Sequence, residues 1–149
     1  MVRSGVSRGL LPLVACLAVP LAAHALIPES RPAQGATVVI NEVQYDPPPS
    51  GSESAYEWIE LLNTGASTVA LEGWRVADNH ATDEIPALEL GAGSYVVLAA
   101  GDGFAELFPA FRGHVVTIGG SIGNGLGNGG DRVLLLGPDD TVVDAMSYG

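Results

Sequence analysis

The residues of this chain that most resemble a chemical site are acidic, and the site would be one for a metal ion. Asp46, Glu53 and Glu57 border one polar segment, and Asp78 and Asp83 lie in another. Calcium is a hard cation that takes several carboxylate and carbonyl oxygens as ligands. These five residues are therefore the candidate calcium ligands, and no other metal or cofactor is predicted. Because the chain lacks EF-hand spacing, solvent-exposed acids in turns are the alternative interpretation.

Patterns that indicate catalysis are scarce. Beyond residue 25 the imidazole bases are His80 and His114, and the chain has neither a GxSxG elbow nor an HExxH helix. Glu42 and Glu60 lie on segments that we expect to be adjacent strands, where they could form a glycosidase-like carboxylate pair. We favour a salt bridge to Arg75, or a position on the rim of the domain. The sequence therefore predicts no catalytic residue and no enzyme.

A glycine-rich segment at residues 119–130 contains one match to a nucleotide-binding pattern. Residues 125–130 fit GxGxxG, but the dinucleotide fingerprint requires a helix after the glycines, so that the pyrophosphate meets a helix N-terminus. Here Asp131 and an apolar, strand-like run follow, and the chain has no lysine for a phosphate-binding P-loop. We interpret the glycines as residues that allow positive-φ turns between two strands.

The charge balance limits the kinds of partner. All six basic residues are arginine, against seventeen carboxylates. Binding nucleic acid with ordinary affinity requires Lys and Arg to neutralise roughly six to ten phosphates, so no nucleic-acid ligand is expected. Anionic membrane surfaces are disfavoured for the same reason. The expected partner is a protein or a component of the cell surface or extracellular medium, and the acidity suits solubility outside the cell.

The first 25 residues have the pattern of a signal peptide. Residues 1–9 carry two arginines and no acid, residues 10–21 are apolar, and Ala23 and Ala25 are small residues where a signal peptidase would cut. Cleavage after Ala25 predicts a secreted or extracytoplasmic cell-surface protein. Two alternatives remain: an uncleaved N-terminal anchor over residues 10–27, and a lipoprotein in which Leu-Val-Ala-Cys at residues 13–16 is a lipobox and Cys16 carries the lipid.

The remainder divides into a spacer and one folded domain. Residues 26–36 contain two prolines and no periodicity, which predicts a flexible spacer. Residues 37–149 alternate short apolar runs with turn signals, and residues 104–108 have helical spacing. Strands are expected at residues 37–45, 57–63, 68–71, 74–78, 95–99, 114–118, 132–136 and 141–147, with a weak edge strand at 85–90 and a polar loop at 78–83. This pattern predicts an all-β, immunoglobulin-like β-sandwich of about eight or nine strands with one short helix.

The large apolar residues of these strands are the predicted core. Side chains alternate between the two faces of a strand, so Trp58 is expected on one face and Ile59 and Leu61 on the other. The predicted structural core consists of Trp58, Ile59, Leu61, Trp74, Tyr95, Val97 and Leu135. With Cys16 removed in a cleaved signal peptide, this core would hold the domain without disulfides.

Five segments, in order along the chain, resemble the lamin-tail domain. They are VINEV at 39–43, EWIELLN at 57–63, LEGWRVAD at 71–78, NGGDRVLLL at 128–136 and VVDAMSYG at 142–149. The resemblance covers residues 38–149. It implies an immunoglobulin-like sandwich without catalytic residues, found in nuclear lamins and, in exported bacterial proteins, often beside nucleases or other hydrolases. The signal-peptide pattern and the lack of coiled-coil heptads make this chain similar to the bacterial exported type.

Two functions follow from this resemblance. The first is an exported, non-catalytic binding, adhesion or structural interaction module. The alternative is the N-terminal accessory domain of a larger secreted hydrolase, a nuclease or phosphoesterase, whose catalytic part is absent here. Relatives commonly continue beyond the position of Gly149, so a domain truncated at its C-terminus is compatible with both. The gene sequence beyond codon 149 separates the two functions.

Overall fold

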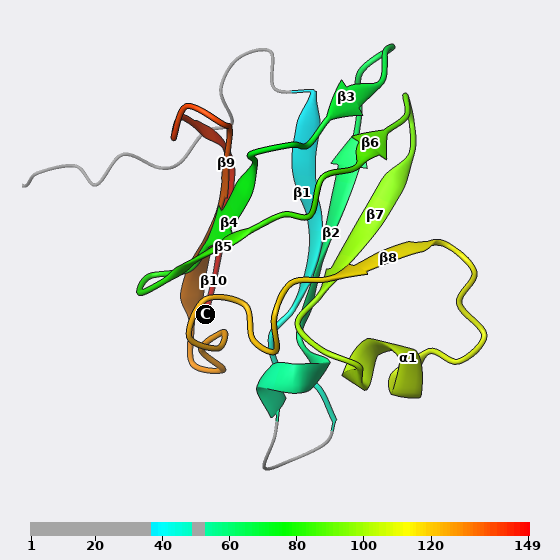
Figure 1. The fold of residues 1–149 in the computed structure, drawn as a ribbon. Helices are drawn as coiled ribbons and strands as arrows, with labels where there is room; N and C mark the ends of the chain where they lie inside the picture. Colours follow the sequence, from blue (N-terminus) through cyan, green and yellow to red (C-terminus); the bar gives the residue numbers. More distant parts are fainter. Residues whose placement is uncertain (1–36, 49–52) are drawn as a thin grey trace, which may run out of the picture.

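The computed structural model describes residues 37–48 and 53–149 (Figure 1). The predicted signal peptide, the spacer and Cys16 lie outside the described residues. Within that part of the chain no helix has the length and apolar character needed to cross a membrane.

Two four-stranded sheets face each other, and a two-stranded sheet lies beside them (Figure 1). The first sheet has the order β1 (Val38–Gln44), β2 (Trp58–Asn63), β7 (Tyr95–Ala99), β8 (His114–Thr117). The second has the order β10 (Val142–Tyr148), β9 (Asp131–Leu136), β4 (Arg75–Ala77), β5 (Thr82–Glu84), and the small sheet pairs β3 (Val69–Ala70) with β6 (Glu89–Leu90). Neighbouring strands are antiparallel except β7 and β8, which are parallel. The predicted all-β sandwich is confirmed.

Two short helical segments connect strands of the first sheet. The 3-10 helix η1 (Glu53–Tyr56) precedes β2, and α1 (Gly103–Leu107) lies between β7 and β8. Because β7 and β8 are parallel, the chain has to cross back along the sheet between them, and α1 belongs to this crossover. Pro109 follows the C-cap residue Phe108 and cannot continue a helical hydrogen-bond ladder.

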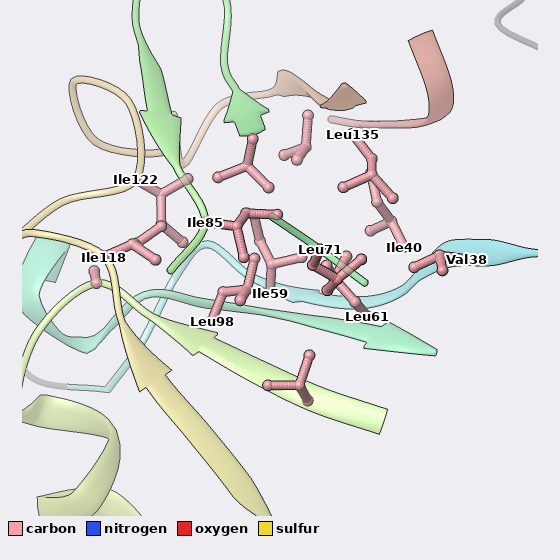
Figure 2. Close-up of a cluster of buried hydrophobic side chains, with 14 of the residues drawn as sticks. Val38, Ile40, Ile59, Leu61, Leu71, Ile85, Leu98, Ile118, Ile122 and Leu135 are labelled. Carbon is pink, nitrogen blue, oxygen red and sulfur yellow. The ribbon is translucent and has the colours of Figure 1, made fainter. Parts of the chain in front are cut away.

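The main hydrophobic core fills the space between the two large sheets. Along β2, Ile59 and Leu61 point into this space and are fully buried, as the period of two in a strand requires. Figure 2 shows these side chains meeting apolar residues of the opposite sheet and of the loops. The labelled members are Val38, Ile40, Ile59, Leu61, Leu71, Ile85, Leu98, Ile118, Ile122 and Leu135.

A second hydrophobic cluster lies on the outer face of the first sheet. Trp58, Val97 and Ala99 of β2 and β7 pack there against Phe104 of α1. The rings of Trp58 and Phe104 meet edge to face with their centroids 5.8 Å apart, a favourable aromatic geometry. This outer cluster attaches α1 to the sandwich.

The predicted core residues divide between these two clusters, with one error. Trp58 and Val97 are buried in the outer cluster, and Ile59, Leu61 and Leu135 are buried in the main core. Trp74 is half-buried against the main core. The placement of Tyr95 in the core is wrong, because its side chain is 43% exposed. Tyr95 begins β7 on the outer face, and Phe104 of α1 covers the far end of that strand instead.

One side of the sandwich is closed where β1 meets β10. β1 is the last strand of the first sheet, and its pairing with β2 shifts register between Ile40 and Glu42. Asp144 of β10, 5% exposed, accepts the N–H of Ile40 at 2.8 Å. A charged acceptor makes such a bond stronger than a neutral one. The strands left at open edges of the two large sheets are β8 and β5.

Two local expectations differ from the structure. Residues 82–84 form β5, although residues 78–83 were expected to be a loop, because pairing with β4 places this polar segment in the sheet. Arg75 of β4 forms an ion pair with Asp140, which lies in the turn between β9 and β10, and it does not contact Glu60. Arg75 and Glu60 belong to different sheets, so the expected salt bridge is wrong.

Candidate functional site

Three polar segments that are distant in sequence converge at one end of the sandwich. Residues 46–48 and 53–57 lie between β1 and β2, residues 78–83 join β4 to β5, and the glycine-rich loop at residues 119–130 leads into β9. Side chains of the first two segments accept hydrogen bonds from backbone N–H groups of the third. We call residues 119–131, with the carboxylates of Glu57, Asp78 and Asp83, the acid-lined loop.

Asp78 is the most heavily bonded carboxylate of this loop. It is 7% exposed. Its Oδ1 accepts the N–H groups of His80 at 2.7 Å and Ala81 at 2.6 Å, and its Oδ2 accepts the N–H of Asn124 at 2.9 Å. Burial raises the pKa of Asp78, but the three backbone hydrogen bonds outweigh burial and the net pKa is lowered. Asp78 is therefore an ionised acceptor that joins two loops.

Glu57 is also buried, but its carboxylate accepts fewer hydrogen bonds than that of Asp78. It is 2% exposed, and its Oε2 accepts one backbone bond, from Leu126 at 3.0 Å. Burial raises the pKa of Glu57 to about 7, and the negative charges of Asp78, Glu53 and Asp131 raise it further against the lowering effect of the Leu126 bond. Glu57 thus titrates near neutral pH.

The remaining acids hold the rim of the loop. Asp83 accepts the Gly123 N–H at 2.5 Å, and Asp131 accepts the Gly127 N–H at 3.1 Å. The side-chain amide of Asn128 donates to Glu53 at 2.8 Å and lies 3.4 Å from Asp46. All five predicted calcium candidates therefore contact the glycine-rich loop. The contribution of residues 128 and 131 was missed, although both follow the glycines directly in the sequence.

Gly123 shows why this loop needs glycine. Its φ is 59°, and a Cβ at this position would overlap the carboxylate of Asp78. A side chain is therefore excluded by conformation and by space together. Downstream, β9 begins at Asp131, so a strand follows the GxGxxG match and the dinucleotide interpretation lacks its helix. The loop is fixed from inside by Ile122 and Leu126, which are buried in the main core.

Metal binding and carboxylate catalysis both require acidic side chains that lie close together. Among the described residues, no three His, Cys, Asp or Glu side chains are placed so that they could hold a metal ion together. Calcium binding stays a prediction. Glu42 and Glu60 are direct cross-strand partners on the first sheet, and Glu60 accepts a bond from the Asn41 side chain at 2.7 Å. This pair lies on an open sheet face where Glu42 is exposed.

A different region carries an apolar hollow. Between α1 and β8 lies a depression of about 360 Å³, lined by Phe104, Ala105, Phe108, Pro109, Phe111, Gly113 and Val115. Phe108 is 41% and Val115 is 36% exposed, and Tyr95 lies beside Phe111 with ring centroids 6.4 Å apart. We call the lining residues together with Tyr95 the α1–β8 corner. Sequence reasoning missed it, although residues 107–130 form a long stretch without any carboxylate.

Comparison with known proteins gives one family. The family model described as Lamin Tail Domain matches residues 31–149, which includes every residue that the structure describes. A search of curated proteins gives no match.

Proposed function

Because the chain belongs to the lamin tail domain family, whose fold is immunoglobulin-like, we propose that it is an exported, non-catalytic interaction module. Its partner is another protein or a component of the cell surface. Nucleic acid is a poor candidate, because seventeen carboxylates oppose six arginines. The protein acts outside the cytoplasm after removal of residues 1–25, whose charged start, apolar run and small residues have signal-peptide order.

The observation that carries the proposal is the exposed α1–β8 corner. Phe104 of this corner is buried in the outer cluster, but Phe108 and Val115 keep 41% and 36% of their surface in water. Exposed apolar surface gathered at a hollow marks interaction sites more often than scattered apolar residues do. In contrast, the buried carboxylates at the other site accept backbone N–H groups of their own chain. A binding role therefore fits better than a catalytic one.

The binding role is tested by photo-crosslinking in cells that export the full chain. A photoreactive amino acid replaces Val115 in one variant and Val142 in another, because both valines are exposed but lie on different sheets. We expect a defined crosslinked species in the extracytoplasmic fraction from at least one position. If neither these positions nor a further series over the exposed loops yields one, the interaction role is wrong.

The non-catalytic role is tested with the exported protein after purification. DNA and bis(p-nitrophenyl) phosphate are incubated with it in the presence of Mg²⁺, Mn²⁺ or Ca²⁺. We expect no turnover above that of a Glu57→Gln, Asp78→Asn double variant. Turnover by the parent that this variant loses, while its circular dichroism shows that it is folded, would show that the acid-lined loop is catalytic. N-terminal sequencing of the same sample locates the cleavage, which we expect after Ala25.

A further inference from the structure

We propose that the open edge of β8 and the adjoining hollow bind a short extended peptide segment, apolar at alternate residues and carrying an acidic residue, which pairs with β8 as an added strand. This inference rests on the proposed interaction function and names the kind of partner. Main-chain hydrogen bonds would supply affinity in this mode of recognition, and pockets for alternate side chains would supply specificity.

The first argument concerns the edges of the two large sheets. The β1 side is closed against β10 by the bond from Ile40 to Asp144. At the other open edge, β5 carries Asp83 and Glu84, and charged residues protect an edge strand from pairing. By contrast, β8 has the sequence His-Val-Val-Thr and no carboxylate. Among these edges β8 is therefore the one suited to accept another strand.

The second argument is geometric. Val115 is the register partner of Val97, whose side chain lies in the outer cluster, so Val115 faces the same side as α1. Val115 also lines the hollow. In a strand added beside β8, every second side chain would lie on the same face as Val115. One of these side chains would be the direct neighbour of Val115. One apolar side chain of the peptide would thus enter the hollow against Phe108 and Phe111.

The third argument is charge. Residues 107–130 contain no Asp or Glu, whereas the complete chain has seventeen. His114 is exposed at the start of β8, and Arg112 is exposed two residues before it. Arg112 is held in place by donating from Nη1 to the carbonyl oxygens of Pro109 and Phe111. A carboxylate on the bound peptide would therefore meet the least negative part of an acidic domain.

The size of the corner decides between a peptide and a second copy of the chain. Aromatic side chains offer about 150–250 Å² each, so the exposed fractions of Tyr95, Phe108 and Val115 amount to roughly 200 Å² of apolar surface. A stable protein interface buries about 800 Å² on each partner. The apolar surface of the corner is a small part of such an area, which favours a short segment that binds weakly.

The test uses the ¹⁵N-labelled protein, purified after export of the full chain, and a defined probe. The probe is the acetylated and amidated hexapeptide TVTFTD, titrated to a few millimolar while backbone amide signals are followed by NMR. We expect shifts that saturate and are concentrated in residues 103–118. The absence of such shifts, or shifts centred on β10 or the acid-lined loop, would overturn the inference.

Two matched variants locate the site. Val115→Asp places a charge at the hollow and should raise Kd for TVTFTD at least about tenfold. Val142→Asp changes an exposed valine on β10 and should alter Kd less than about twofold. Amide spectra recorded without peptide serve as the control that both variants are folded. Equal loss of binding in the two variants would mean that the peptide is not bound at the corner.

The chemistry of the partner is tested with altered peptides. Backbone N-methylation at positions 2 and 4 or at positions 3 and 5 blocks opposite edges of a strand, so only one pattern should abolish binding. Equal tolerance of both patterns would refute strand addition. Replacing the final Asp by Asn or Lys should weaken binding stepwise, and tighter binding by the Lys peptide would refute the charge argument.

Two further outcomes separate this inference from the proposed function. Dimerisation through β8, seen by sedimentation velocity at millimolar protein and abolished by Val115→Asp, would replace the peptide by a second copy. A cellular crosslink formed from Val142 or from the acid-lined loop, and not from Val115, would leave the interaction role intact while refuting β8 as its site. Failure of crosslinking from every position would instead remove the proposed function itself.

Discussion

The acid-lined loop and the α1–β8 corner use their side chains in opposite ways. In the loop, Asp78 accepts three backbone N–H groups, and Gly123 leaves no space for a Cβ beside it. At the corner, Phe108 and Val115 remain exposed although their burial would be favourable. Asp78, whose residue type suggests chemistry, therefore also joins two loops of the fold. The exposed parts of Phe108 and Val115 are apolar, and they are available for contact.

The largest effect is expected from Asp78→Ala. This substitution leaves three backbone N–H groups of two loops without their acceptor, which should cost about 3–5 kcal/mol of unfolding free energy. Asp46→Ala is the matched control, because Asp46 is exposed and has one contact at 3.4 Å. Urea unfolding at pH 7 gives both values. Similar losses for the two variants would contradict the structural role assigned to Asp78.

Gly123→Ala should have the next largest effect. A φ of 59° costs a residue with a Cβ about 1–2 kcal/mol, and displacement of the Asp78 carboxylate adds a loss of similar size. Gly129→Ala is the control, since a Cβ there meets nothing within 4 Å and its φ is not positive. We expect a clear decrease in Tm for the first variant and almost none for the second. Equal Tm values would mean that the loop tolerates side chains generally.

Glu57 should make stability depend on pH. Its pKa is about 7 in the folded protein, against an ordinary value of 4.5, so the folded state binds a proton that the unfolded chain has lost between these values. Stability should therefore fall as pH rises from about 4.5 to 7. The pKa of Asp78 is lowered from 3.8, so its contribution is present above that value and is lost as pH falls below it. The highest Tm is expected near pH 4.5–5.

Glu57→Gln provides the control for this pH dependence. The variant keeps the shape of the side chain but cannot titrate, so the decrease in Tm between pH 4.5 and 7 should become shallower. The difference between parent and variant isolates the contribution of Glu57 from those of the other titratable groups. Parallel curves for the two proteins would show that Glu57 ionises normally.

The smallest effect is expected at Val115 of the corner, which can be compared directly with its register partner Val97. Val97→Ala removes two buried methyl groups and should cost about 2 kcal/mol. Val115→Ala alters its register partner, which is 36% exposed, and should change stability by less than about 0.5 kcal/mol. Thermal unfolding measures both. A large loss from Val115→Ala would show that the corner belongs to the core, which would weaken the binding proposal.

Much of the fold could be predicted because local patterns are strong. The apolar run at residues 95–99 coincides with β7, and alternation along β2 sends Ile59 and Leu61 inward. Residues 82–84 show the limit of such patterns, because a polar segment becomes a strand through its partner, β4. The exposure of Tyr95 has a similar origin. It depends on where α1 lies over the sheet, which periodicity within β7 does not encode.

The two sites differ in how far the sequence leads. Glu57 and Asp78 could be identified by residue type, but their convergence on one loop depends on which strand ends meet in three dimensions. Their different pKa directions follow from the number of N–H donors that each receives, which only the folded chain determines. The corner consists of ordinary apolar residues, and only their exposure distinguishes them.

The two tryptophans lie in different hydrophobic clusters, and this gives the protein two separate optical reporters. Trp58 belongs to the outer cluster beneath α1, against Phe104, whereas Trp74 packs against the main core between the sheets. Fluorescence of a Trp74→Phe variant would therefore follow the attachment of α1, and that of a Trp58→Phe variant would follow opening of the sandwich. If α1 detaches before the sheets separate, the two emission changes would occur at different denaturant concentrations.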